Sequence, residues 1–170
     1  GAEKFLDIKC RMAGLVPDAV VIVATVRALK HHGGVAKADL NNEDLAALER
    51  GLPNLLRHVD NIKNTYHLPC VVAINAFPTD TAAELDLVAA KCRELDVNVA
   101  LSEVWAKGGE GGKALAEEVV RLCEQPKLDA FTYAYEDGTS IQYKLNAIVN
   151  RVYHGSRAVL TPAAQKQYQQ

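Results

Sequence analysis

Aromatic side chains and long apolar runs are both scarce in this sequence. Phe, Tyr and Trp make up only 6% of its 170 residues, although apolar residues reach 49%, which is enough for the core of one ordinary domain. The longest unbroken apolar stretch, around residues 19–24, is far shorter than the roughly 20 residues that span a bilayer. The sequence therefore predicts a folded domain and no membrane segment.

An excess of one charge is also lacking. Nineteen basic residues stand against twenty-one acidic ones, which gives a net charge of −2 and no basic block, so we expect no nucleic-acid partner. Residues 1–11 mix charges and resemble no export signal. The four cysteines lie far apart, without a CxxC pair or a His at metal-ligand spacing: Cys10, Cys70, Cys92 and Cys123. We expect reduced, mostly buried cysteines, no metal site and a cytoplasmic location.

The pattern of apolar residues predicts an α/β fold. Three short runs rich in β-branched residues predict strands buried on both faces, over residues 19–25, 70–75 and 97–102. Apolar residues at spacings of three and four predict helices over residues 43–65, 80–95 and 112–123. The alternation is typical of a doubly wound parallel sheet. Residues 31–42 are expected to form a surface loop, and residues 141–153 another amphipathic helix.

The segments that follow the second and third predicted strands form the candidate site, because ligands of open parallel sheets bind beyond the carboxyl ends of the strands. Residues 75–81 (NAFPTDT) place Phe77 at one strand end, beside Pro78, which restricts the backbone. Residues 105–112 (WAKGGEGG) place Trp105, the only tryptophan, at the next. Two aromatic side chains there would clamp a flat ring, with ~0.5–1.5 kcal/mol from each contact.

Each of these residues also has a simpler interpretation. Thr79 or Asp80 would serve as the N-cap of the next helix. Phe77 and Trp105, taken singly, belong to residue types that are more often found in the core. The glycines either permit a tight loop or let an anion approach the backbone. Lys30, before the predicted loop, is expected in solvent.

Nucleotide-binding motifs are incomplete in the glycine-rich segment. A phosphate loop reads G-x-x-x-x-G-K-[ST], but Lys107 stands at the first glycine position relative to Gly112 and Lys113, and Ala114 replaces the metal-binding hydroxyl. Residues 109–114 (GEGGKA) match the looser dinucleotide pattern G-x-G-x-x-[GA], but they lie several residues beyond the predicted strand. An NAD-dependent oxidoreductase is therefore the weakest enzyme hypothesis.

Residues 23–34 (VATVRALKHHGG) closely resemble a characteristic segment of the formate–tetrahydrofolate ligases. Residues 1–11, 75–81 and 105–112 are similar to further segments of that family, in the same order and at the same spacing. The resemblance implies a three-layer, P-loop NTPase-like α/β unit that is an incomplete part of a larger fold. In that interpretation residues 1–125 form an α/β segment with a folate and nucleotide cleft, and residues 126–170 form a helical extension of the same domain.

The resemblance also implies an activity, that of an ATP-dependent ligase using Mg²⁺. Formate is phosphorylated to formyl phosphate, and N10 of tetrahydrofolate then attacks the formyl carbon to give 10-formyltetrahydrofolate and phosphate. The residues implied for folate are Phe77, Trp105, Pro78 and Asp80, and those implied for the nucleotide side of the cleft are Gly108 and Gly109. No catalytic residue and no metal ligand is implied within this chain, and the parent enzyme is expected to be a homo-oligomer.

The family's phosphate loop has no counterpart in these residues and is expected upstream of residue 1, with further sequence beyond residue 170. Because stabilisation of a transferring phosphoryl group needs that loop, we expect the isolated chain to be inactive or nearly so. Two hypotheses from other classes remain open. In the first, the chain is a folate-binding module without turnover. In the second, it is a structural segment that assembles with a partner.

Overall fold

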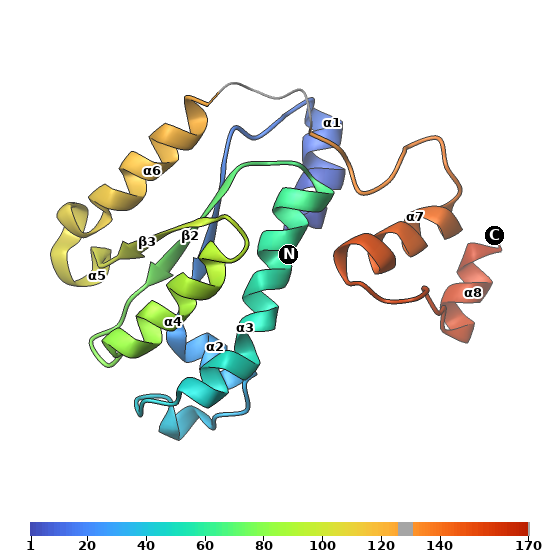
Figure 1. Cartoon of the computed structure of the whole chain (residues 1–170). Coiled ribbons are helices and arrows are strands. Elements are labelled where there is room, and N and C mark those ends of the chain that lie inside the picture. The colour runs from blue at the N-terminus through green and yellow to red at the C-terminus, as the bar shows by residue number, and fades with distance from the viewer. Residues whose placement is uncertain (126–130, 170) are drawn as a thin grey trace. The chain divides into compact units, whose positions relative to one another are not determined.

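Figure 1 shows the computed structural model of the chain, which describes residues 1–125 and 131–169. The chain divides into two compact units. The larger unit comprises Val16–Phe131, and the smaller combines Gly1–Leu15 with Thr132–Gln170. The strands and the strand-end segments expected to bind a ligand all belong to the larger unit.

The larger unit is built on a parallel sheet of three strands in the order β1-β2-β3. The strands are β1 (Val20–Ala24), β2 (Cys70–Asn75) and β3 (Asn98–Ser102), which confirms the three predicted strands to within one residue at each end. In the register of the sheet, Ala73 lies opposite Val23 in β1 and Ala100 in β3. The carboxyl ends of all three strands therefore lie at the same edge.

Helices cover the sheet on two sides, which confirms the three-layer α/β architecture (Figure 1). On one side α6 (Lys113–Cys123) packs on β2 and β3, where its Leu122 joins Val71 and Ala100 in a buried cluster. On the other side α3 (Leu45–Asp60) contacts β1, and α4 (Ala82–Arg93) contacts β3 and α3. The connections contain α2 (Val26–His32), α5 (Val104–Lys107), η2 (Lys37–Asp39), η3 (Asn61–Thr65) and η4 (Gly108–Gly112).

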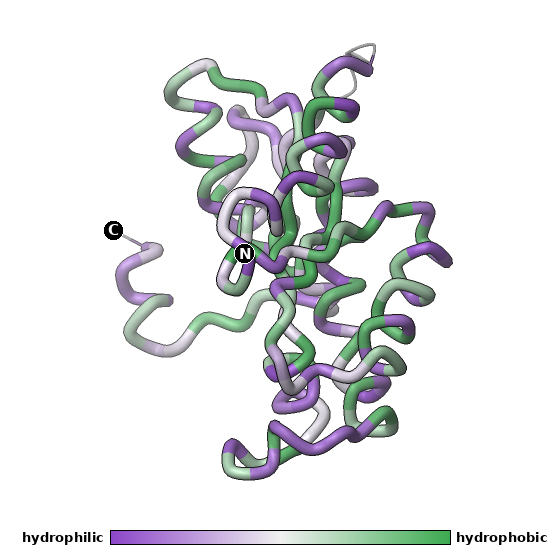
Figure 2. Tube along the Cα trace, turned by 90° about the vertical axis from the view of Figure 1, so that its left-hand side faces the viewer, coloured by the Kyte–Doolittle hydropathy of each residue, from purple (hydrophilic) through white to green (hydrophobic). Residues whose placement is uncertain are grey.

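The longest helix, α3, shows why these segments fold as the sequence predicts. Its first turn is capped by Asp44, whose Oδ1 accepts a hydrogen bond from the backbone N of Ala47 at 2.8 Å. Its apolar residues at spacings of three and four are buried: Leu48, Leu52, Leu55 and Val59. Figure 2 shows hydrophobic residues gathered along the strands, whereas the helices alternate between hydrophobic and hydrophilic residues.

The three strands are not equally buried, which corrects the expectation that all are covered on both faces. In β2 every residue but the last is buried, whereas burial alternates along β1. Val21 and Val23 are 39% and 67% exposed. They face the same side as Val71, with which Val21 is paired, but α6 packs on β2 and β3. Among the described residues, β1 is thus an edge strand with one open apolar face.

Two glycines let α2 and α3 approach each other closely. A Cβ atom added at Gly33 would lie 1.8 Å from the carbonyl oxygen of Ala47, and one at Gly51 would lie 1.9 Å from that of Leu29. Backbone atoms cannot move aside as a flexible side chain can, so both positions require glycine. Gly51 disfavours a helix by propensity alone. Close packing explains its place inside α3, and this packing holds α2 at the end of β1.

The smaller unit joins the two ends of the chain. Its elements are η1 (Lys4–Cys10), α1 (Arg11–Ala13), α7 (Ile141–Ala147), η5 (Ile148–Val152) and α8 (Pro162–Tyr168). Buried Asp7 accepts a hydrogen bond from the backbone N of Ala134 at 2.7 Å, and the Arg11 guanidinium lies 3.8 Å from the ring centroid of Tyr133. The helix predicted over residues 141–153 is confirmed as α7 and η5, whereas α8 at residues 162–168 was not predicted from the sequence.

The cysteine side chains are mostly buried, as predicted. Cys10, Cys70 and Cys92 are buried, and Cys123 is exposed. Burial raises the pKa of the Cys70 and Cys92 thiols to about 11, so both stay protonated at neutral pH. Within residues 1–125 and 131–169, no helix combines the length and the apolar character needed to span a membrane.

Candidate functional site

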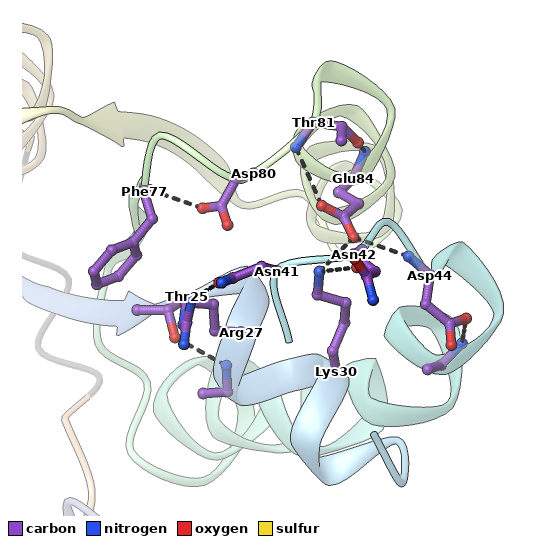
Figure 3. A network of polar contacts seen from close by, with 12 residues as sticks. Thr25, Arg27, Lys30, Asn41, Asn42, Asp44, Phe77, Asp80, Thr81 and Glu84 are labelled. Carbon is purple, nitrogen blue, oxygen red and sulfur yellow. Dashed lines mark hydrogen bonds and ion pairs between the residues drawn. The ribbon is translucent and has the colours of Figure 1, made fainter. Parts of the chain in front are cut away.

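The segment that carries Phe77, the first of the two candidate aromatic residues, is a short turn between β2 and α4. The backbone N of Asp80 donates to Phe77 O, and the backbone N of Phe77 donates to Asp80 Oδ2, both at 2.9 Å (Figure 3). Pro78 lies inside this turn, where its fixed φ suits the backbone. The Phe77 side chain is 39% exposed, so it is not a core residue. The turn therefore presents one aromatic side chain at the edge of the sheet.

The segment that carries Trp105, the second candidate aromatic residue, is a loop that is closed by hydrogen bonds between its own backbone atoms. After β3, the backbone N of Glu103 donates to Gly111 O at 3.0 Å, and the N of Lys107 donates to Glu103 O at 2.9 Å. A Cβ at Gly111 would lie 2.4 Å from Glu103 O, and Gly108 has φ +58°, so both positions need glycine. Trp105 lies in α5 within this loop and is 75% exposed.

The two aromatic segments leave the sheet side by side. The backbone N of Ala76 donates to Ser102 O at 3.0 Å, which continues the pairing with β3 one residue past the end of β2. Phe77 follows Ala76 directly, and Trp105 lies three residues beyond Ser102. The structure thus brings the two predicted stacking residues to neighbouring strand ends, both accessible to a ligand.

A cation at the carboxyl end of β1, Arg27, also lies at the site. Arg27 lies in α2, just after β1, and donates a hydrogen bond from Nη1 to Asn41 Oδ1. Its guanidinium carbon lies 5.8 Å from the ring centroid of Phe77, within the range of a cation–π contact. Figure 3 shows Arg27 and Phe77 on the same side of the network. Nothing in the sequence pattern singled out Arg27, because its partners come from other segments.

Asp80 carries a buried oxygen with an unfilled hydrogen-bonding capacity. Its Oδ2 accepts from Phe77, but within the described part of the chain its Oδ1 has no hydrogen-bond partner. Burial raises the pKa of Asp80, with a further upward contribution from the charge of Glu84, whereas the Phe77 hydrogen bond and the cations Lys30 and Arg27 act in the opposite direction. A buried acceptor without a partner is costly, so Asp80 is suited to accept a hydrogen bond from a ligand.

Behind these residues lies a buried ion pair. Lys30 Nζ is 2.8 Å from Glu84 Oε1, and both side chains are 0% exposed. Burial opposes the charge on Glu84, but hydrogen bonds from Lys30 and from the backbone N atoms of Thr81 and Asp44 hold its pKa below its ordinary value. The expectation that Lys30 lies in solvent is wrong, because Glu84 of α4 and the carbonyl of Asn42 pair with its ammonium group.

The N-cap of α4 also differs from the expectation. Thr81, and neither Thr79 nor Asp80, begins the helix, and it forms a capping box with Glu84. The sequence does contain this signal, since Thr81 and Glu84 match the pattern T-x-x-E. Asp80 therefore does not cap the helix, and its carboxylate instead closes the turn by accepting a hydrogen bond from Phe77.

The glycine-rich segment offers open backbone but no metal site. A Cβ added at Gly108 or Gly109 would meet nothing within 4 Å, so space is available on that side of the loop. Among the residues that the structure describes, no group of three or more His, Cys, Asp or Glu side chains could hold a metal ion. Gly109 lies seven residues past the end of β3 and follows α5, whereas the dinucleotide fingerprint occupies the tight turn directly after a strand.

One comparison with known proteins bears on these residues. The model of the family described as formate--tetrahydrofolate ligase matches residues 1–170, which is the whole chain. The match includes the three strand ends, the aromatic segments and the buried ion pair.

Proposed function

This chain belongs to the formate–tetrahydrofolate ligase family, an enzyme family of one-carbon metabolism, and we propose that its strand ends form the folate-binding wall of that ligase. The reaction joins formate to tetrahydrofolate at the expense of ATP. In the mechanism that we propose, formyl phosphate forms first, and N10 of tetrahydrofolate then attacks the formyl carbon. A C–N bond forms, N10 gives up its proton, the C–O bond to phosphate breaks, and inorganic phosphate leaves with the electron pair of that bond.

The observation that carries this proposal is the exposure of two aromatic side chains at neighbouring strand ends. Phe77 and Trp105 are 39% and 75% exposed, and both follow the carboxyl end of a strand, where open parallel sheets bind their ligands. Folate contains a flat pterin ring and an aminobenzoyl ring, and both are suited to stacking. Phe77 and Trp105 would hold one of these rings between their faces.

Pro78 and Asp80 would complete the folate side of the cleft. Pro78 adds a rigid apolar surface next to Phe77. Asp80 would accept a hydrogen bond from an N–H group of the pterin through Oδ1, the oxygen that has no partner in the described residues. The broad side-chain torsion of a carboxyl group allows the small rotation that this contact needs.

The described residues do not fit ATP and Mg²⁺ as phosphoryl-transfer partners. A phosphate loop needs a lysine and a hydroxyl after its glycines, but Ala114 follows Lys113 here. No carboxylate cluster suitable for a metal ion occurs in the part of the chain that the structure covers. Gly108 and Gly109 leave room for a nucleotide to approach the loop, and we assign them no step of the reaction. We propose that the chain alone binds folate without turnover.

A structural role is the second candidate function, and the open face of β1 favours it. Val23 is 67% exposed at the edge of the sheet, where a partner would cover it. Sedimentation of the chain with and without Val23→Thr tests this role. Association that the substitution abolishes would support an assembly segment, whether or not folate binds.

A fluorescence titration with tetrahydrofolate tests the proposed function. Trp105 is the only tryptophan, so its emission reports on the site without a label. We expect saturable quenching, with a dissociation constant about tenfold higher for Phe77→Ala, because a lost stacking contact costs about 1.4 kcal/mol. Phe5→Ala is the matched control, since Phe5 is 47% exposed but belongs to the smaller unit. Absence of quenching in a folded wild-type sample would overturn the proposal for this chain.

A further inference from the structure

The buried ion pair behind the binding wall is not accounted for by stability. Lys30 and Glu84 are both 0% exposed, and their charged atoms lie 2.8 Å apart. Removing two charges from water is costly, and well-packed apolar residues of similar volume stabilise a fold as well or better. A buried pair of this kind therefore calls for another explanation.

Glu84 also makes more contacts than a capping residue needs. In a capping box the N3 carboxylate accepts a hydrogen bond from the N-cap backbone, as Glu84 Oε2 does from Thr81 at 3.1 Å. Glu84 Oε1 accepts a second backbone hydrogen bond, from Asp44 at 3.1 Å, and Lys30 Nζ donates to Asn42 O at 2.8 Å. The pair thus joins three segments, which are α2, the loop before α3 and the start of α4.

The contacts continue from the pair to the ligand-facing residues on two sides (Figure 3). On one side Asp80, just before α4, accepts a hydrogen bond from the backbone N of Phe77 at 2.9 Å. On the other side Asn42 follows Asn41, which accepts the hydrogen bond of Arg27. The two branches meet where Arg27 lies 5.8 Å from the Phe77 ring centroid. Together with the peptide bonds that join Asp80 to Thr81 and Asn41 to Asn42, these contacts form a closed ring that begins and ends at the ion pair.

We propose that Lys30 and Glu84 are positioning residues that fix Phe77 and Arg27 relative to each other, so that the aromatic ring and the guanidinium form one rigid wall for the ligand. The inference rests on the proposed function for the identity of that ligand, a folate. A wall that is ordered before binding gives higher affinity, because less loop and side-chain freedom is lost in the complex. Loss of the pair therefore loosens the wall even where the fold survives.

The test variant is Lys30→Met/Glu84→Met, which replaces both charges with apolar side chains of similar length. It removes the ion pair without leaving one buried charge unpaired, so the fold should survive. Lys91→Met/Glu94→Met is the matched control. Lys91 and Glu94 form a pair of similar length, 2.9 Å, at the other end of α4, but the Lys91 side chain is 30% and the Glu94 side chain 61% exposed, and the pair lies outside the ring of contacts.

Amide hydrogen exchange tests the positioning role without any ligand. We expect the amide of Phe77 to exchange about tenfold faster or more in the test variant, because its turn lies in the loosened ring, whereas the amides of Asp44 and Thr81 exchange faster simply because they lose their acceptor, Glu84. Amides within β2 should stay as protected as in the wild type and in the control variant. Uniformly faster exchange, or an unchanged Phe77 amide, would contradict the proposal, since the pair would then act on overall stability or on the α4 cap alone.

Tetrahydrofolate titration then tests the consequence for binding. With the unfolding midpoint near that of the wild type, the test variant should bind about tenfold more weakly, and the control variant should bind as the wild type does. Wild-type affinity in a variant with a loosened Phe77 amide would overturn the inference. If the wild-type chain binds no folate, the proposed function fails, and the exchange experiment still decides whether the pair positions the turn. If the double variant does not fold, Glu84→Gln takes its place in the same exchange measurement.

Discussion

The two aromatic strand ends of the larger unit are held in different ways. The turn of Phe77 is closed by its own hydrogen bonds with Asp80 and is also linked to other segments through Arg27 and the Lys30–Glu84 pair. The loop of Trp105 is closed by a backbone hydrogen bond between its own ends, Glu103 and Gly111. Under our proposal the position of Phe77 depends on three separate segments of the chain. The position of Trp105 is a property of one loop.

The largest effect on stability is expected from Glu84→Ala, which removes the Lys30–Glu84 pair that links the Phe77 turn to other segments. The substitution leaves the buried Lys30 ammonium without its carboxylate and the backbone N atoms of Thr81 and Asp44 without their acceptor. We expect the free energy of unfolding at pH 7 to fall by ~3–5 kcal/mol, as for other broken buried pairs. Urea unfolding followed by circular dichroism measures this change.

The pH dependence of stability supplies the control for that variant. The folded-state pKa of Glu84 lies below its ordinary value of 4.5, so its stabilising contribution is complete above about that pH and is lost as the pH falls through the folded pKa. The difference in unfolding free energy between wild type and Glu84→Ala should therefore shrink in acid. A difference that stays constant from neutral pH into strong acid would show that Glu84 does not act through its charge.

A smaller effect on stability is expected from Gly111→Ala, which disturbs the hydrogen bond between Glu103 and Gly111 that closes the Trp105 loop. A Cβ there would lie 2.4 Å from Glu103 O and 2.5 Å from Glu103 C, so the loop must open. We expect a loss of ~1–3 kcal/mol in unfolding free energy from the steric conflict and lower fluorescence anisotropy of Trp105. Gly109→Ala is the matched control, because nothing lies within 4 Å of its added Cβ. Equal anisotropy in both variants would show that the Glu103–Gly111 closure does not position Trp105.

The same division separates what the sequence could predict from what it could not. The strands and the helices α3, α4 and α6 follow from local apolar patterns, and Phe77 and Trp105 follow from their places after two strands. Lys30 and Glu84 lie on different helices, so no local pattern pairs them. Arg27 was missed for the same reason. The exposure of β1 could not be foreseen either, because it depends on which strands α6 covers.

The smallest effect concerns Asp80, where stability and binding should respond in opposite directions. The folded-state pKa of Asp80 is raised above its ordinary value of 3.8, chiefly by burial, so its ionised form opposes folding at neutral pH. In Asp80→Asn the amide oxygen can still accept the hydrogen bond from Phe77, and the charge is gone. We expect a gain in unfolding free energy of less than about 1 kcal/mol at pH 7, since the carboxyl is only partly buried and solvent screens its charge.

The gain in unfolding free energy of Asp80→Asn should vanish in acid. The effect of the substitution on folate binding is expected at neutral pH. A carboxyl with a raised folded pKa binds its proton more tightly when folded, so the penalty from Asp80 disappears as the pH falls through that pKa and the two proteins become equally stable. Folate affinity at pH 7 should be lower in Asp80→Asn, because the amide NH₂ replaces the free acceptor Oδ1. A variant that is more stable and binds folate as well as the wild type would show that Asp80 only closes the turn with Phe77.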